Sequence, residues 1–257
     1  SAPRTAWGWA WAGVLAGVLP AVVAFAPAHW LAGGVARATQ GQVQLLQPRG
    51  TVWTGSAQLV LTGGQASKDS AALPGRVDWQ LRPTWGGLRA RLQAGCCTAE
   101  PLQAQVHLRW VGPQITLADG QSQWPAALLA GLGTPWNTLQ PQGQLALQTR
   151  ALAVQWAAGR MVLSGQAQLD ARAMSSRLST LRPMGSYRLV LQGGEVPTLA
   201  LSTLDGALQL SGSGQWVGNR LRFAGEASAA PEREAALSNL LNIIGRRNGA
   251  RSIITVG

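Results

Sequence analysis

An alternation of apolar and polar residues with a period of two runs through the chain beyond residue 40, most clearly at residues 42–45, 77–81, 103–110 and 187–191. Successive side chains of a β-strand point to opposite faces of a sheet, so this pattern predicts strands with one buried and one solvated face. Glycine, which supplies 32 of the 257 residues, interrupts the pattern at turn spacing together with proline. We therefore predict a mainly β protein whose body is a meander of ten or more antiparallel strands.

Residues 124–132, with the sequence WPAALLAGL, depart from the period of two and have helical spacing. Pro125 can occupy the first turn of a helix, where its missing N–H has no cost. We expect a short mid-chain helix here that divides the sheet into two halves, residues 37–120 and 141–257.

A second departure, over residues 231–247, predicts a C-terminal amphipathic helix. Its apolar residues fall on one face, glutamates lead the segment and arginines close it, which matches the helix dipole. The apolar positions are Leu237, Leu240, Leu241 and Ile244. We expect the helix to end at Gly245 and a last strand to follow over residues 252–256.

Residues 7–28 form an uncharged, predominantly apolar run, and roughly 20 such residues are needed to cross a bilayer as a helix. This run predicts a single transmembrane anchor, kinked at Pro20. The indole rings that would lie in the two headgroup layers belong to Trp7, Trp9, Trp11 and Trp30. The predicted organisation is an anchor region over residues 1–36 and a β-rich domain over residues 37–257.

A cleaved signal peptide is the alternative interpretation of this run, because Ala26 and Ala28 form an A-x-A-like site behind the apolar stretch. The apolar core is longer than the roughly 7 to 15 residues usual in such peptides, which favours retention of the helix as an anchor. Arginines lie on both sides of the run, at Arg4 and at Arg37, so the charge bias does not decide the orientation.

The composition excludes several classes of function. His29 and His107 are the only histidines, so the sequence offers no histidine cluster for a metal and no second base for a hydrolytic triad. The acids are scattered, mostly at turns, and no glycine-rich stretch has the lysine of a phosphate loop. We predict no cofactor, no metal site and no enzymatic activity.

The net charge is +11, with 21 basic against 10 acidic residues, and nearly all the basic residues are arginines. They are spread along the strands and do not form a basic stripe with aromatics, so the sequence does not favour nucleic acid as a partner. Solvated sheet edges or contacts with anionic lipid headgroups account for the arginines.

Cys96 and Cys97 are adjacent in the sequence. Their Cα atoms are held about 3.8 Å apart by the peptide bond, closer than the usual disulfide minimum near 4.4 Å. Free thiols, a vicinal disulfide and a link to another chain all stay open. No C-x-x-C motif is present, which disfavours a redox enzyme.

Several segments in a fixed order resemble one known family. The resemblance is carried by residues 50–55, the P-x-G-x-L-x-L pattern from Pro141 to Leu147, and residues 183–188, 201–214, 225–227 and 237–247. These segments, together with an anchor near the start, are similar to type II secretion system protein N. The likeness covers nearly the whole chain, although the double cysteine matches no feature of the family.

The resemblance implies a bitopic protein of the bacterial inner membrane with a periplasmic β-rich domain, which serves the export of folded proteins beside other inner-membrane subunits. The resemblance also implies that the protein is not an enzyme. The family looks related in general architecture to the AsmA-like group, which implies an extended, curved sheet and, as an alternative function, binding or transfer of lipid. We nominate Arg246, Arg247 and Arg251, at the basic end of the C-terminal helix, as partner-binding residues, against the alternative that this helix only caps the sheet.

Overall fold

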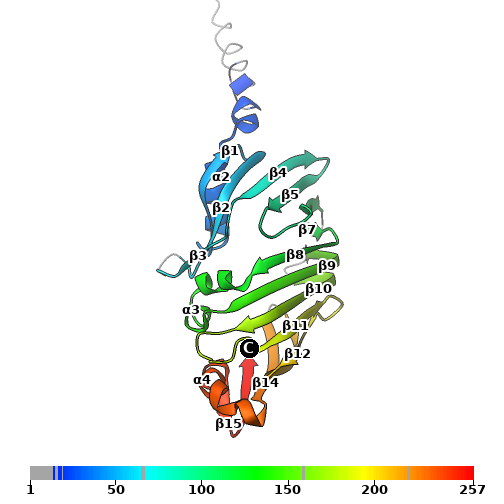
Figure 1. Cartoon of the computed structure of the whole chain (residues 1–257). Coiled ribbons are helices and arrows are strands. Elements are labelled where there is room, and N and C mark those ends of the chain that lie inside the picture. The colour runs from blue at the N-terminus through cyan, green and yellow to red at the C-terminus, as the bar shows by residue number, and fades with distance from the viewer. Residues whose placement is uncertain are drawn as a thin grey trace, which may run out of the picture.

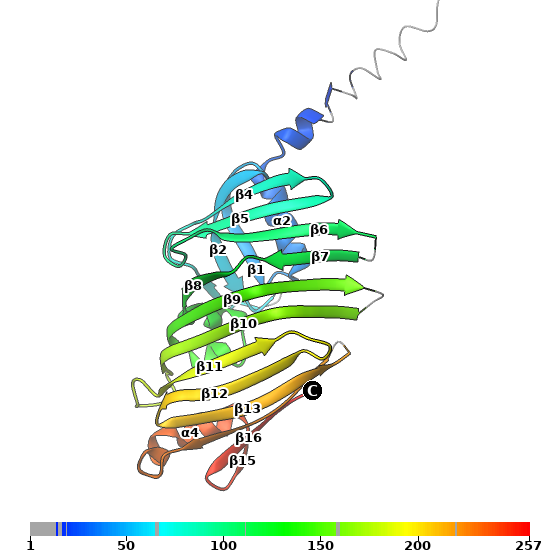
Figure 2. The same ribbon diagram turned by 90° about the vertical axis from the view of Figure 1, so that its right-hand side faces the viewer.

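The computed structural model describes residues 14, 17–18, 20–64, 67–110, 112–157, 160–218 and 220–257. Across these residues 16 strands form one sheet. Every pairing between them is antiparallel, and the order along the sheet is β1-β2-β4-β5-β6-β7-β9-β10-β11-β12-β13-β14-β16-β15, with β3 added to β2 and β8 to β9. Figures 1 and 2 show a single twisted ladder that runs from the blue end of the chain to the red end. The prediction of a mainly β antiparallel meander is confirmed.

The strands are β1 (Val43–Gly50), β2 (Thr54–Thr62), β3 (Ser70–Ala72), β4 (Val77–Thr84), β5 (Gly87–Ala94), β6 (Leu102–Arg109), β7 (Gly112–Leu117), β8 (Gly120–Pro125), β9 (Gln142–Ala157), β10 (Arg160–Ser175), β11 (Gly185–Gln192), β12 (Thr198–Gly206), β13 (Leu208–Val217), β14 (Arg220–Ala229), β15 (Arg246–Asn248) and β16 (Arg251–Val256). The helices are α2 (Ala28–Ala38), the 3-10 helix η1 (Ala126–Leu132), α3 (Trp136–Leu139), the 3-10 turn η2 (Pro231–Arg233) and α4 (Glu234–Ile244).

The register of the strands gives the sheet one apolar and one polar face. Leu45 pairs with Leu59 on β2, and Leu189 pairs with Leu201 on β12, so leucines from neighbouring strands share a face. The alternate residues, mostly Gln, Ser, Thr and Arg, lie on the other side. We call the apolar side the inner face, because α2, η1 and α4 pack on it (Figure 2).

Three separate clusters of buried residues hold the helices on the inner face. At one end Ala28 of α2 packs with Ala57 and Trp79. In the middle Leu128 of η1 packs with Leu73. At the far end α4 buries three leucines against strands β11 to β14; this largest cluster comprises Met184, Tyr187, Leu208, Ala227, Leu237, Leu240 and Leu241.

A β-bulge keeps the inner face apolar along the two longest strands, β9 and β10. The register shifts between Ser164 and Gln166, opposite Ala151, which has a φ of 46°. Gly165 has a φ of 79°, and a Cβ there would overlap the carbonyl oxygen of Ala151, so glycine is required. The extra residue on β9 places Leu147 and Val154, an odd number of residues apart, on the same face.

The mid-chain helix forms directly after Pro125 as predicted, although as a 3-10 helix. It does not divide the sheet, and that part of the prediction is wrong. β7 pairs directly with β9, so the segment from β8 to α3 loops out onto the inner face and the ladder continues past it.

The C-terminal helix ends at Gly245 as predicted, and Leu237, Leu240 and Leu241 are its buried residues. The following arginines form the short strand β15, which pairs with β16. The turn and last strand are therefore confirmed, with one strand more than expected.

Trp7, Trp9 and Trp11 lie outside the described residues. No helix in the part of the chain that the structure describes has both the length and the apolar character that a bilayer crossing requires. The described residues 20–24 are helical, and α2 begins afresh at Ala28 behind Pro27, which bridges to Thr51. The sequence pattern did not predict α2, which packs against β1 and β2 and carries Trp30 on an exposed surface.

Candidate functional site

His107 lies on the outer face of β6, where its register partner is Gly87. Its imidazole Nε2 is 3.3 Å from Oε1 of Gln105, two residues away on the same strand. No hydroxyl or carboxylate partner accompanies it in the described hydrogen-bond network, so the groups of a triad are not brought together. Among the described residues no group of three or more His, Cys, Asp or Glu is placed to hold a metal ion.

Asp170 is the buried carboxylate of the sheet, on the outer face of β10. Arg188 on β11 donates to both of its oxygens at 2.8 and 2.9 Å, Gln168 donates at 3.1 Å, and Arg172 lies 3.6 Å away. The hydrogen bonds from Arg188 hold the pKa of Asp170 below its ordinary value, against the opposing effect of burial. Both of its oxygens accept hydrogen bonds from side chains of the sheet, so this carboxylate joins β10 to β11.

The structure joins Cys96 and Cys97 in a vicinal disulfide in the loop after β5. Cys97 is buried in the middle cluster, and its carbonyl oxygen accepts a hydrogen bond of 2.7 Å from the backbone N–H of Gln123 on β8. The disulfide therefore sits where the loop is fastened to β8. Cys96 is exposed whereas Cys97 is buried, and the chain has no other cysteines.

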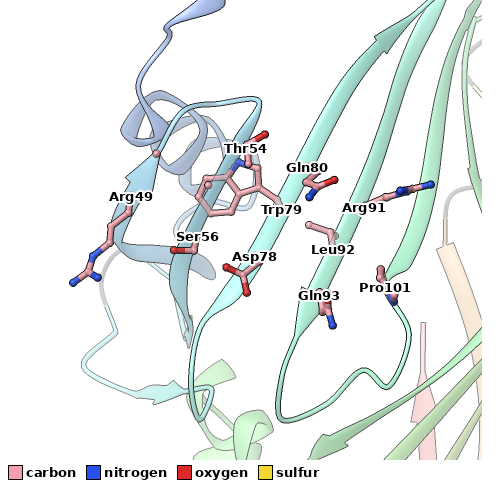
Figure 3. Close-up of a pocket in the computed structure, with 12 residues that line it drawn as sticks. Arg49, Thr54, Ser56, Asp78, Trp79, Gln80, Arg91, Leu92, Gln93 and Pro101 are labelled. Atoms are coloured by element: carbon pink, nitrogen blue, oxygen red, sulfur yellow. The ribbon is translucent and has the colours of Figure 1, made fainter.

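An open pocket of about 600 Å³ lies over the paired segments of β2 and β4 (Figure 3). Asp78 and Gln80 of β4 line one side and Arg91 and Gln93 of β5 line another, as the labelled side chains show. The indole of Trp79 closes it, with Nε1 donating to the carbonyl oxygens of Thr51 and Val52. The pocket holds one carboxylate, with no base beside a free hydroxyl, and it therefore offers polar contacts without an activated nucleophile.

Two apolar cavities lie on the inner face. The α2 cavity, about 320 Å³, lies between α2 and Trp124, and the α4 cavity, about 330 Å³, lies between α3 and α4. Leucines supply much of both linings. Leu31, Leu45, Leu59, Leu81 and Leu92 line the first, and Leu139, Leu145, Leu169, Leu189, Leu201 and Leu240 line the second. Cavities of this size and composition fit hydrocarbon better than a polar substrate.

The arginines nominated from the sequence are largely occupied within the chain. Arg247 pairs with Glu234 of α4 and Arg251 pairs with Glu226 of β14 at 3.2 Å. Arg246 is exposed and has no ion pair among the described residues. These pairs tie the β15–β16 hairpin to its neighbours, so a role in binding a partner stays a prediction for all three.

The sequence reasoning missed the two cavities and the most exposed aromatic residues. Trp85 and Trp110, at the tips of the β4–β5 and β6–β7 hairpins, are completely exposed. The sequence held a signal for their exposure. Each of these two tryptophans directly follows a strand and lies at a turn, where a side chain has no core to enter.

These observations define a class of protein: a single-sheet antiparallel β protein that offers surfaces and apolar cavities and, in its described residues, no assembled catalytic groups. A family model described as type II secretion system (T2SS), protein N, matches residues 41–254, and the chain belongs to that family. The match spans the ladder from before β1 into β16. No curated protein and no solved structure matches the chain. Membership gives the chain a role in type II secretion and suggests a location in the cell envelope.

Proposed function

We propose that the chain is a non-enzymatic inner-membrane component of the type II secretion system, whose sheet domain lies in the periplasm and acts in assembly or scaffolding. The observation that carries this proposal is the family match along the ladder from before β1 into β16, residues 41–254. The apolar run at residues 7–28 supports an anchor directly before the domain.

The two ends of the ladder support a scaffold that does not polymerise through its own strands. β1 carries Pro48 and a register shift between Leu46 and Arg49. Both features hinder the pairing of a further strand with its free edge. At the other end β15 has only three residues, two of them arginines. Partners are therefore expected on the faces and hairpin tips and not at the sheet edges.

Crosslinking in the living cell tests this proposal. A photo-crosslinking amino acid placed at Arg246, at the tip residue Trp85 or at the outer-face residue Ser202 should capture other inner-membrane subunits of the secretion system. Protease added to spheroplasts should cleave the sheet domain. Failure to capture any secretion subunit from any of these positions, or protection of the domain from external protease, would contradict the proposal.

Lipid binding is the second candidate function, and the two apolar cavities favour it. They lie on one continuous apolar face, and helices cover that face only at intervals (Figure 1). Acyl chains placed there would remove apolar surface from water, at roughly 25 cal/mol for each Å² buried.

The matched positions Leu189 and Val190 separate this candidate from the first. Leu189 lines the α4 cavity, whereas Val190 lies next to it on the outer face of the same strand. A photo-crosslinking amino acid at Leu189 should yield lipid adducts by mass spectrometry, and one at Val190 should not. Equal adduct yields, or none at Leu189, would remove lipid binding and leave the scaffolding proposal intact.

A further inference from the structure

Three tryptophans lie along one side of the ladder, where the hairpins end. Gly87, His107, Gln114 and Gln155 are successive register partners across β5, β6, β7 and β9, so they mark one level of the sheet. The three tryptophans lie beyond this level towards the tips: Trp85, Trp110 and Trp156. Figure 2 shows these strand ends together on its right-hand side. We call these three residues the tryptophan rim.

The tryptophan rim is exposed to solvent together with apolar residues of the inner face. Trp85 and Trp110 are completely exposed, and 41% of Trp156 is accessible. Leu108 and Ile115 of the same β6–β7 hairpin, farther from its tip, are exposed as well. Successive hairpins are about 10 Å apart, twice the spacing of neighbouring strands, so the rings form a row of projecting side chains and not a pocket. This concentration of exposed large apolar side chains on one side of the sheet marks a candidate binding surface.

Two arginines of the β4–β5 hairpin lie farther from its tip than Trp85. Arg82 on β4 and Arg89 on β5 are direct register partners, both exposed, and like charges in this position repel each other. Neither forms an ion pair among the described residues. Farther along the same side, Arg220 and Arg222 are also exposed, and Glu195 is the acid at the described tips. A bound anion would relieve the repulsion between Arg82 and Arg89.

We propose that the tryptophan rim and the Arg82–Arg89 pair form a site that binds the surface of a bilayer containing anionic phospholipids. Indole rings favour the headgroup layer, where the ring is in an apolar environment and the N–H is solvated. Guanidinium groups pair with lipid phosphates. Projecting rings need no matching pockets on a fluid headgroup layer, whereas a folded protein partner would have to supply one pocket for each ring. The inference goes beyond the secretion role and does not depend on it.

Vesicle flotation of the full chain tests the site. The chain is held in nanodiscs of phosphatidylcholine, which shield the apolar run ahead of Pro27, and mixed with vesicles of phosphatidylcholine alone or with about one third phosphatidylglycerol. The loaded nanodiscs should float with the phosphatidylglycerol vesicles and not with the neutral ones, and empty nanodiscs should float with neither. Because a basic residue near an anionic surface contributes about a fivefold gain in affinity, Arg82→Gln with Arg89→Gln should weaken binding about thirtyfold.

Matched variants decide whether these residues carry the binding. Arg177→Gln with Arg182→Gln removes the same charge from exposed loops outside the rim and should change binding less than twofold. Trp85→Ala with Trp110→Ala should weaken binding at least tenfold without changing circular dichroism, because both side chains are exposed. Equal losses in the Arg177/Arg182 control, equal binding to neutral vesicles, or no flotation of the wild type would overturn the proposal. Normal vesicle binding by the rim variants together with a lost crosslink to a protein subunit would also overturn it and assign the rim to a protein partner.

Discussion

Leu241→Ala tests whether the three inner-face clusters stabilise the ladder separately. The side chain of Leu241 is completely buried in the α4 cluster, and its carbonyl oxygen accepts a hydrogen bond of 2.7 Å from Ser252 on β16, which fixes the position. A buried leucine replaced by alanine typically loses about 2 to 5 kcal/mol, and the loss rises above the lower end of that range where the surroundings cannot collapse. We expect about 3 kcal/mol here, since Leu241 does not line the neighbouring cavity and Ser252 holds the backbone.

Hydrogen exchange measured by mass spectrometry on the full chain is the assay. A loss of about 3 kcal/mol corresponds to roughly a hundredfold faster opening. This acceleration should appear in α4, β14 and β16 and be absent from α2 and β1. Leu73→Ala is the matched control, because Leu73 is equally buried in the middle cluster and should accelerate exchange there and not in α4. Uniform acceleration along the whole ladder by either variant would refute the separation of the clusters.

Two further predictions follow from single contacts. Asp170→Asn should lower the melting temperature at pH 7. The pKa of Asp170 is depressed below its ordinary value of 3.8 in the fold, so its contribution is complete above about pH 5 and is lost as the pH falls. The difference in melting temperature between the variant and the wild type should therefore narrow steadily with acidification below about pH 5. A constant difference between them across this range would contradict the role of the pair with Arg188. Gly55→Ala should destabilise the α2 end by about 1 to 3 kcal/mol in denaturant titration, because a Cβ there would lie 2.6 Å from Cζ2 of the buried Trp79. Gly95→Ala is the control: its Cβ would meet open space, and it should have little effect.

The fold was predictable where the side-chain pattern is local. The alternation of two along β4, β6 and β11 fixed the face of each strand, and the leucine spacing from Leu237 to Leu241 identified α4. Gly245 ended that helix as expected. These features depend on residues a few positions apart, which is the range over which periodicity carries information.

The order of the strands in the sheet depends on pairing between residues far apart in the chain. The alternation of apolar and polar residues carries no signal for that order. Nothing around Pro125 indicates that β7 would pair with β9 across the intervening helix. The start of α2 at Ala28 was hidden because the same alanine ends the apolar run that predicts an anchor. Bulges such as the one at Gly165 shift the alternation by one residue, so a pattern with a strict period fails within β9 and β10.

The candidate binding surfaces were less predictable still. The two inner cavities are assembled from leucines of many strands and helices, none of which differs in sequence from an ordinary core residue. The tryptophan rim needs the register of four hairpin strands before Trp85, Trp110 and Trp156 are known to lie on one side. Composition indicated many tryptophans, and only the topology separates buried Trp79 from these exposed rings.

Secretion of a folded substrate in a deletion strain tests the central claim most directly, because the claim is that this chain serves type II secretion through its surfaces and not through a reaction. The deletion should leave the substrate in the periplasm, and both the wild-type chain and His107→Ala should restore its export to the medium. Export that continues unchanged in the deletion strain would contradict the claim. So would a His107→Ala chain that is folded and abundant yet fails to restore export.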